Sequence, residues 1–375
     1  MSARQLVISQ DQEALRSAVR GLLSDHAPWT SVLARTETDA PYDTALWERL
    51  GRDLGVTGLL IPEEFGGAGG DARDLAVVSE QLGAFVAPVP FLGSAVLTTA
   101  ALLTVRSEPL AAELLGQLAG GERTAALGMP AATMPGADLS TTIVAVDGAL
   151  TGTASRVFDL AAADLVIVLA WDEGEPALYA VRPDASTAVV TPITPLDLTR
   201  PLASLELSAA PAGRLVRGAP ALAAVSTALV TGAAMLAAEQ VGVAQWSLDT
   251  TVAYLKDRHQ FGRPIGSFQA LKHRIAHVWR RTGLARAAAI AAADALASET
   301  DPDEIATIVA VAASYCSETA VFAAEEMVQL HGGIGMTWEH PAHLYLGRAK
   351  ADELLLGAPD QHRTRLAELV NLPAA

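Results

Sequence analysis

The chain has 375 residues, and its length, composition and charge already exclude several classes of protein. At roughly one domain per ~150 residues, it predicts two or three domains with a large core, which argues against a disordered, tail-type protein. Hydrophobic residues make up 51% of the chain and aromatic residues 5%, so Ala, Leu and Val must form the interior, as in closely packed helices. The net charge of −16 disfavours nucleic acid as a partner, because it repels polyphosphate.

Cys316 is the single cysteine of the chain. A single cysteine excludes an internal disulfide and a cysteine-based metal site. Its flank, Ala312-Ala313-Ser314-Tyr315, is typical of a helix interior. We therefore expect Cys316 to be a small buried apolar residue, and we expect no metal in the protein.

We expect neither a secretory signal at the N-terminus nor a membrane-spanning segment. Residues 1–9 lack the basic patch, apolar stretch and cleavage site of a secretory signal, so we expect a cytoplasmic location. Two uncharged stretches, 81–105 and 218–238, are long enough to be considered as membrane spans. Two prolines interrupt the first, and glycine and hydroxyl residues dilute the second. We expect both to be buried helices, and no membrane as a partner.

The first predicted domain, residues 1–122, carries helical punctuation. Ser9 followed by Gln12 predicts a capping box in front of a first amphipathic helix. Further helices are predicted over 44–54, 72–85, 93–103 and 109–118, with glycine and proline clusters between them. This region is therefore predicted to be an N-terminal helical domain.

The second predicted domain, residues 123–216, consists of short β-rich runs. Turn signals such as Asp147-Gly148 separate the runs. The runs are 143–146, 165–169, 177–181, 188–190 and 202–207. They predict a small antiparallel barrel or sandwich, and we expect the barrel.

The third predicted domain, residues 217–375, is helical again, and its helices are long. Helices are predicted over 220–258, 267–298, 301–330 and 359–369. The third of these opens with Asp301-Pro302-Asp303-Glu304, a cap followed by a first-turn proline and acids. Long apolar faces need neighbouring helices of similar length, so we expect a C-terminal four-helix bundle. The fold class is thus mainly α with a central β domain.

The segment 257–281 reverses the charge of this acidic chain. It holds Arg258, Arg263, Lys272, Arg274, Arg280 and Arg281 against the single acid Asp257. A glycine-containing break over 262–266, followed by Ser267 as a predicted cap, would place free backbone N–H groups beside arginines. The segment is either a solvated helix face or a site for a phosphate-bearing ligand.

A second candidate site, residues 329–335, stands at the end of a predicted long helix and reads QLHGGIG. Gly332 fits a plain helix C-cap. Three glycines in four residues would also let a ligand lie directly against the backbone. The residues alone leave both interpretations open.

Three motifs together resemble the acyl-CoA dehydrogenase family. The first is R-x-x-F-G-x-x-I-x-x-F-Q, which begins at Arg258, and the second is Q-x-x-G-G-x-G, which begins at Gln329. The third is P-E-E-F-G-G at residues 62–67. They lie in the order and at the distances of the family, and the helix, β, helix layout matches over essentially the whole chain.

The resemblance implies a flavoprotein oxidoreductase. It implies non-covalent FAD, a CoA thioester substrate and α,β-dehydrogenation, in which a carboxylate removes the α-proton while the β-hydride passes to the flavin. In this family the adenosine and pyrophosphate half of FAD is held by a neighbouring subunit. The residues that match that half are Arg258, Phe261, Gln269, Gln329, Gly332 and Gly333. A guanidinium suits pyrophosphate, and an aromatic ring suits stacking.

The half of the family's site that surrounds the flavin ring is eroded in this sequence. The family loop T-E-P-G-A-G-S-D is matched by Thr133-Met134-Pro135-Gly136-Ala137-Asp138, in which Thr133 survives as a cofactor candidate. On the following strand, Arg156 stands where the family has tryptophan and Phe158 where it has a hydroxyl residue.

The family's catalytic glutamate position falls on Leu356, which cannot accept a proton. The alternative base position of a few members falls near Gly232 or Ala233, which are equally inert. The nearest carboxylates are Glu239 and Glu353, weak candidates for a base, and the catalytic residue therefore stays unassigned.

Three hypotheses follow from this pattern. The first is the base-lacking subunit of a heteromeric complex, resembling the small actinobacterial-type subunits of paired acyl-CoA dehydrogenases that act on steroid-like CoA esters. The second is a self-sufficient dehydrogenase, as a homo-oligomer, with Glu239 or Glu353 as base. The third is a flavin-free scaffold without catalysis. The family implies an electron-transfer flavoprotein as acceptor, and the sequence does not specify the acyl group.

Overall fold

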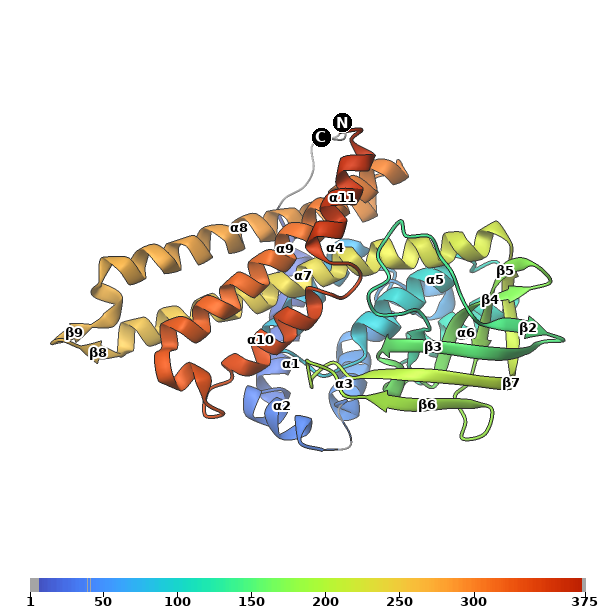
Figure 1. Ribbon diagram of the computed structural model, residues 1–375, viewed down its shortest axis with the longest axis horizontal. Helices are drawn as coiled ribbons and strands as arrows, with labels where there is room; N and C mark the ends of the chain where they lie inside the picture. Colours follow the sequence, from blue (N-terminus) through green and yellow to red (C-terminus); the bar gives the residue numbers. More distant parts are fainter. Residues whose placement is uncertain (1–6, 39, 41, 373–375) are drawn as a thin grey trace.

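Residues 7–38, 40 and 42–372 are described by a computed structural model (Figure 1). Three long helices run side by side along the longest axis, and the β region lies at one end of them. The N-terminal helices pack against the same long helices. Helical regions on both sides of a central β region confirm the predicted fold class.

The N-terminal region is helical because capping signals and apolar spacing agree. Ser9 accepts a hydrogen bond from the backbone of Gln12, and the Gln12 side chain returns one, which confirms the capping box. The helices are α1 (Gln10–His26), α2 (Trp29–Thr36), α3 (Thr44–Leu54), α4 (Ala72–Ala84), α5 (Thr99–Thr104) and α6 (Pro109–Ala119). Helix α2 has only two turns and was not predicted.

One predicted helix of this region, 93–103, takes a different form. Phe91–Thr98 is a π-helix, η3, and only the following α5 is regular α-helix. All eight residues of η3 are buried, so packing rather than local propensity determines its geometry. Two 3₁₀ turns, η1 (Val56–Gly58) and η2 (Glu63–Phe65), connect α3 to α4.

The central β region is a closed sheet, as predicted. Its strands are β1 (Ala125–Leu127), β2 (Val144–Val146), β3 (Ala149–Phe158), β4 (Leu165–Asp172), β5 (Glu175–Val181), β6 (Ala188–Ile193) and β7 (Leu202–Arg217). The pairing runs β4-β2-β3-β7-β5, and β5 pairs back onto β4. Most pairs are antiparallel, but β1 and β2 both pair with β4 in parallel, which corrects the purely antiparallel expectation.

The C-terminal region contains the predicted long helices. They are α7 (Ala219–Asp257), α8 (Gln269–Ser298) and α9 (Pro302–His331), followed by η6 (Gly332–Met336), α10 (Ala342–Asp352) and α11 (Pro359–Leu369). Asp301 caps α9 as predicted. The predicted cap Ser267 is wrong: it lies in the 3₁₀ turn η5 (Ile265–Ser267), and Phe268 precedes the helix without a side-chain cap.

Small residues let the helices of the core approach one another closely. A Cβ atom on Gly83 of α4 would lie 2.1 Å from the Glu239 carbonyl oxygen, and one on Gly242 of α7 would lie 1.9 Å from that of Glu80. Neither position admits a side chain. Cys316 is buried on α9, and burial raises the pKa of its thiol, which confirms its interpretation as a core residue.

Two helical segments, Ala219–Asp257 and Pro302–Met336, are long and apolar enough to cross a membrane. In their most apolar windows, 72% and 56% of the residues are buried inside the protein. Since the protein itself covers these residues, their length and hydropathy are weak evidence for a membrane span.

Candidate functional site

The first cofactor motif lies at the end of the bundle farthest from the β region (Figure 1). Helix α7 ends at Asp257, and the chain forms a hairpin of β8 (His259–Gln260) and β9 (Arg263–Pro264) before α8 begins at Gln269. Phe261 lies at the hairpin tip with φ +52°, and 89% of it is exposed. Arg258 and Gln269 are exposed beside it.

The second cofactor motif lies at the same end. The rings of Tyr254 and His331 stack at 4.5 Å, which joins the end of α7 to the end of α9. Gln329 is in the last turn of α9, and Gly332 and Gly333 follow it in the exposed η6 turn. Within the described part of the chain, chain neighbours apart, no atom lies within 4 Å of where a Cβ would stand on either glycine.

This end of the bundle fits the adenosine and pyrophosphate half of FAD. Open space over two glycines, an exposed guanidinium and an exposed aromatic ring are what a dinucleotide lying on the backbone requires. Met336 and Trp338 are also largely exposed here. Exposed apolar side chains gathered in one place mark a binding surface.

A cavity of about 330 Å³ lies between the β region and the bundle. It is lined by Pro130, Ala131, Ala132, Arg156, Pro195, Leu196, Asp197, Arg200, Leu202, Ala351, Leu354 and Leu355. Thr133 lies just outside this lining, and its backbone N–H donates to the Pro130 carbonyl at 2.9 Å. Arg156 lines the cavity with φ +54°, whereas Phe158 is buried in the core that the sheet shares with the helices.

The lining of this cavity does not fit a flavin ring in the family's manner. Most of its surface is apolar, and two of its three charged side chains, Asp197 and Arg200, are committed to ion pairs. Arg156 makes no ion pair within the described part of the chain. The ring would therefore find few partners for its polar edge.

The ion pairs beneath the cavity form one buried cluster. Arg348 contacts Glu239 and Asp197, each at 2.5 Å. Arg200 contacts Glu239 and Asp352, each at 2.6 Å. Two guanidinium groups thus hold three acidic side chains, and the loop before β7 is tied to α7 and α10.

The cluster makes Glu239 a structural charge. Burial opposes its ionisation, but Arg200 and Arg348 outweigh burial and lower the pKa of Glu239. A carboxylate held by two guanidinium groups is a poor general base. Glu353, the other candidate, lies 3.7 Å from Lys350 and lines neither this cavity nor the one beside Leu356.

The two positions at which the family carries a base are in contact here. A Cβ on Gly232 would lie 3.0 Å from Leu356 Cδ1 and 2.5 Å from Leu97 Cδ2. Leu356 is 1% exposed and has φ +56°, and the cavity beside it has a volume of about 10 Å³. Leucine side chains therefore fill the place where a base and an acyl group would meet.

The bundle end and the region around Leu356 are too far apart to bind one ligand within a single chain. Gly232 and Arg258 are 26 positions apart along α7, which corresponds to about 39 Å at ~1.5 Å per residue. The bundle end and the cavity near Leu356 therefore belong to different binding sites.

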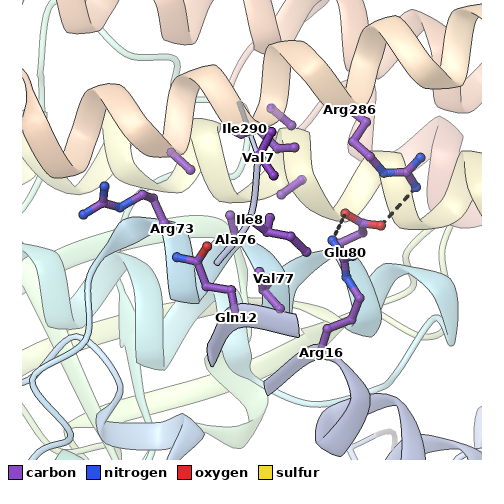
Figure 2. A pocket seen from close by; sticks show the side chains of 13 residues that line it. Val7, Ile8, Gln12, Arg16, Arg73, Ala76, Val77, Glu80, Arg286 and Ile290 are labelled. Atoms are coloured by element: carbon purple, nitrogen blue, oxygen red, sulfur yellow. Dashed lines mark hydrogen bonds and ion pairs between the residues drawn. The ribbon is translucent and has the colours of Figure 1, made fainter. Parts of the chain in front are cut away.

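A further pocket lies between α1, α4, α7 and α8 (Figure 2). Glu80 bridges Arg16 and Arg286 at its rim, at 3.8 and 3.0 Å. The volume of this pocket is about 30 Å³, which accommodates only one or two water molecules. The pocket is therefore not a substrate site.

Sequence reasoning missed Leu97, Asp197, Arg200 and Arg348 as determinants of this region. Leu97 lies in a long uncharged run, and Asp197 and Arg200 lie in a loop without a motif. The signal that was available is the charge in D-L-T-R, residues 197–200, within an otherwise uncharged stretch. Its partners on α7 and α10 are distant in sequence.

Comparisons with known proteins agree with this geometry. The profile described as "Acyl-CoA dehydrogenase, N-terminal domain" matches residues 9–122, and "Acyl-CoA dehydrogenase, C-terminal domain" matches residues 222–370. The acyl-CoA dehydrogenase IpdE2 of Mycolicibacterium smegmatis is 36% identical, covering 96% of this chain and 98% of that protein. IpdE2 of Mycobacterium tuberculosis is 35% identical over 95% and 96%.

Solved structures show the same likeness. The ChsE4–ChsE5 complex from Mycobacterium tuberculosis gives a TM-score of 0.85 at 25% identity, covering 99% of this chain and 100% of that chain. The Tcur3481–Tcur3483 steroid ACAD variant gives 0.84 at 28% identity, covering 96% and 98%. The chain therefore belongs to the acyl-CoA dehydrogenase family, whose members are oxidoreductases that use FAD.

Proposed function

We propose that this chain is the base-lacking subunit of a heteromeric acyl-CoA dehydrogenase. The carrying observation is the packing of both Leu356 and Leu97 against Gly232. Neither of the family's base positions bears a carboxylate, and a leucine fills the space between them. Abstraction of the α-proton needs a base within hydrogen-bond reach, so a second subunit must supply it.

The contribution of this chain is the end of its bundle. Arg258, Phe261 and Gln269, with Gln329, Gly332 and Gly333, would hold the adenosine and pyrophosphate of FAD whose ring lies in the partner. When bound, FAD supplies the hydride acceptor. The chain's own residues bind and orient it, and its exposed apolar side chains pack against the partner.

The proposed substrate is a CoA thioester with a bulky acyl group. This rests on one structural neighbour, which is described as a steroid ACAD. We further propose a cytoplasmic location and an electron-transfer flavoprotein as acceptor, as is usual in the family. We also expect neither membrane nor nucleic acid as a partner.

The test is purification of the chain alone and together with a catalytic homologue from the same organism. We expect flavin absorbance and bleaching by an acyl-CoA only from the co-expressed pair. A yellow lone chain that is bleached by an acyl-CoA would instead support the self-sufficient enzyme or homo-oligomer. A pair that forms without flavin would support the scaffold.

A further inference from the structure

A small cavity lies directly beside Leu356, on the side of the bundle core. Residues of α7, α9, α10, α11 and the turn before α11 line it: Ala233, Leu236, Gln240, Ala313, Ser317, Asp352, Leu355, Leu356, Gly357 and His362. Its volume of about 10 Å³ is the space that one water molecule needs.

Three polar atoms of this lining are buried without a hydrogen-bond partner. They are Asp352 Oδ2, Gln240 Oε1 and Ser317 Oγ, on residues that are 1%, 2% and 4% exposed. A buried polar atom without a partner loses its hydration and gains nothing in return. Three of them around one cavity indicate a missing polar ligand rather than three separate defects.

The other polar atoms of two of these side chains are already engaged. Asp352 Oδ1 accepts a hydrogen bond from Arg200 at 2.6 Å, and Gln240 Nε2 donates to the Asp352 carbonyl oxygen at 3.2 Å. These bonds fix both side chains, so the unpartnered oxygens cannot turn away from the cavity without breaking a bond that exists.

We propose that one ordered water molecule occupies this cavity and bridges Asp352, Gln240 and Ser317. The water donates to Gln240 Oε1, which can only accept. Its second hydrogen and its lone pairs are shared between Asp352 Oδ2 and the Ser317 hydroxyl. The water donates to the one of these two that accepts, and it accepts from the one that donates. The chemistry fits a molecule that both donates and accepts, and the volume excludes anything larger.

This site goes beyond the proposed function, because it would exist whether or not the chain works with a catalytic partner. It gives the region behind Leu356 a polar interior. On one side, Leu356 packs with Leu97 against Gly232. On the other side, it lines the hydrated cavity together with Asp352.

The test compares Ser317→Ala with Ser317→Val by thermal unfolding of the full chain. Alanine keeps room for the water, whereas valine fills it. With a bound water, valine displaces the bridge and leaves two oxygens unpaired, so Ser317→Val should lower Tm clearly more than Ser317→Ala. Val311→Ala, at a half-exposed position of α9, measures the difference in helix propensity between the two residues.

If the cavity is dry, valine gains packing and Ser317→Val is at least as stable as Ser317→Ala after that correction, which overturns the proposal. A crystal structure decides independently of either variant. Density within hydrogen-bond distance of the three atoms supports the water. An empty cavity, or direct bonds among the three side chains, refutes it.

Discussion

Two regions of this chain match parts of the family's active site: the end of the bundle and the surroundings of Leu356. They differ in how much their residues contribute to the stability of the fold. At the bundle end, Phe261 is 89% exposed and Gly332 and Gly333 of η6 face open space, so these motif residues contribute little to folding. Around Leu356, most side chains belong to the packed core, and the buried ion cluster lies close by. The residues of the first region are free to bind a ligand and a partner, whereas those of the second region stabilise the fold.

The largest effect on stability is expected from removing Arg348, the centre of the ion cluster. This variant tests whether the cluster stabilises the fold. Arg348→Met leaves Glu239 and Asp197 buried without one of their charge partners. We expect a loss of about 3–5 kcal/mol in the free energy of unfolding, measured by urea titration. Arg363→Ala, which removes an exposed pair with Glu318, is the control and should cost less than about 1 kcal/mol. Equal losses would show that the cluster is not structural.

The second prediction concerns the bundle end in the assembled complex. Arg258→Ala should weaken FAD retention by about 1.5–3 kcal/mol, or about 10- to 150-fold in Kd, because it removes a charge-assisted contact with pyrophosphate. The measurement is flavin release during dialysis. Arg274→Ala is the matched control, since Arg274 already pairs with Glu326 at 2.7 Å. Unchanged retention in Arg258→Ala would count against the assignment.

The third prediction uses the pH dependence of the ion cluster. Burial raises the pKa of Asp352 to about 8 in the folded chain. The native state therefore holds a proton that the unfolded chain releases near pH ~4, and this contribution to stability is lost as pH rises toward 8. The slope is at most about 1.4 kcal/mol per pH unit.

Asp352→Asn should remove this slope between pH 5 and 8 in urea unfolding. Glu239, whose pKa is lowered, contributes in the opposite direction and only below this window, as pH falls toward its folded pKa. A variant with the same slope as the unmodified chain would show that Asp352 is ionised throughout.

The smallest expected effect is that of Phe261→Ala on the isolated chain. Because the side chain is exposed, the free energy of unfolding should change by less than about 0.5 kcal/mol. Flavin content of the complex should nevertheless fall. A large loss of stability in the isolated chain would mean that Phe261 supports the fold, and the contrast between the two regions would weaken.

Much of the fold was predictable because its signals are local. The capping pair Ser9 and Gln12, the cap Asp301 and the apolar spacing of α7 and α9 depend on nearby residues. The π-helix η3 and the parallel pairings of β4 were not predictable, since distant partners impose them.

The site divides in the same way. The loss of a carboxylate at position 356 is visible in the sequence, but the packing of Leu356 and Leu97 against Gly232 is not. The arginines that neutralise Glu239 lie 39 residues before it and 109 residues after it, so no local pattern reveals that this carboxylate is engaged.

The most direct test of the difference between the two regions is a crystal structure of the heteromeric complex with FAD. We expect the adenosine to lie against Arg258, Phe261 and Gln269 of this chain and the flavin ring to lie in the partner subunit. The cavity between Pro130 and Leu355 of this chain should hold no flavin. A flavin ring in that cavity, beside Arg156, would contradict the account.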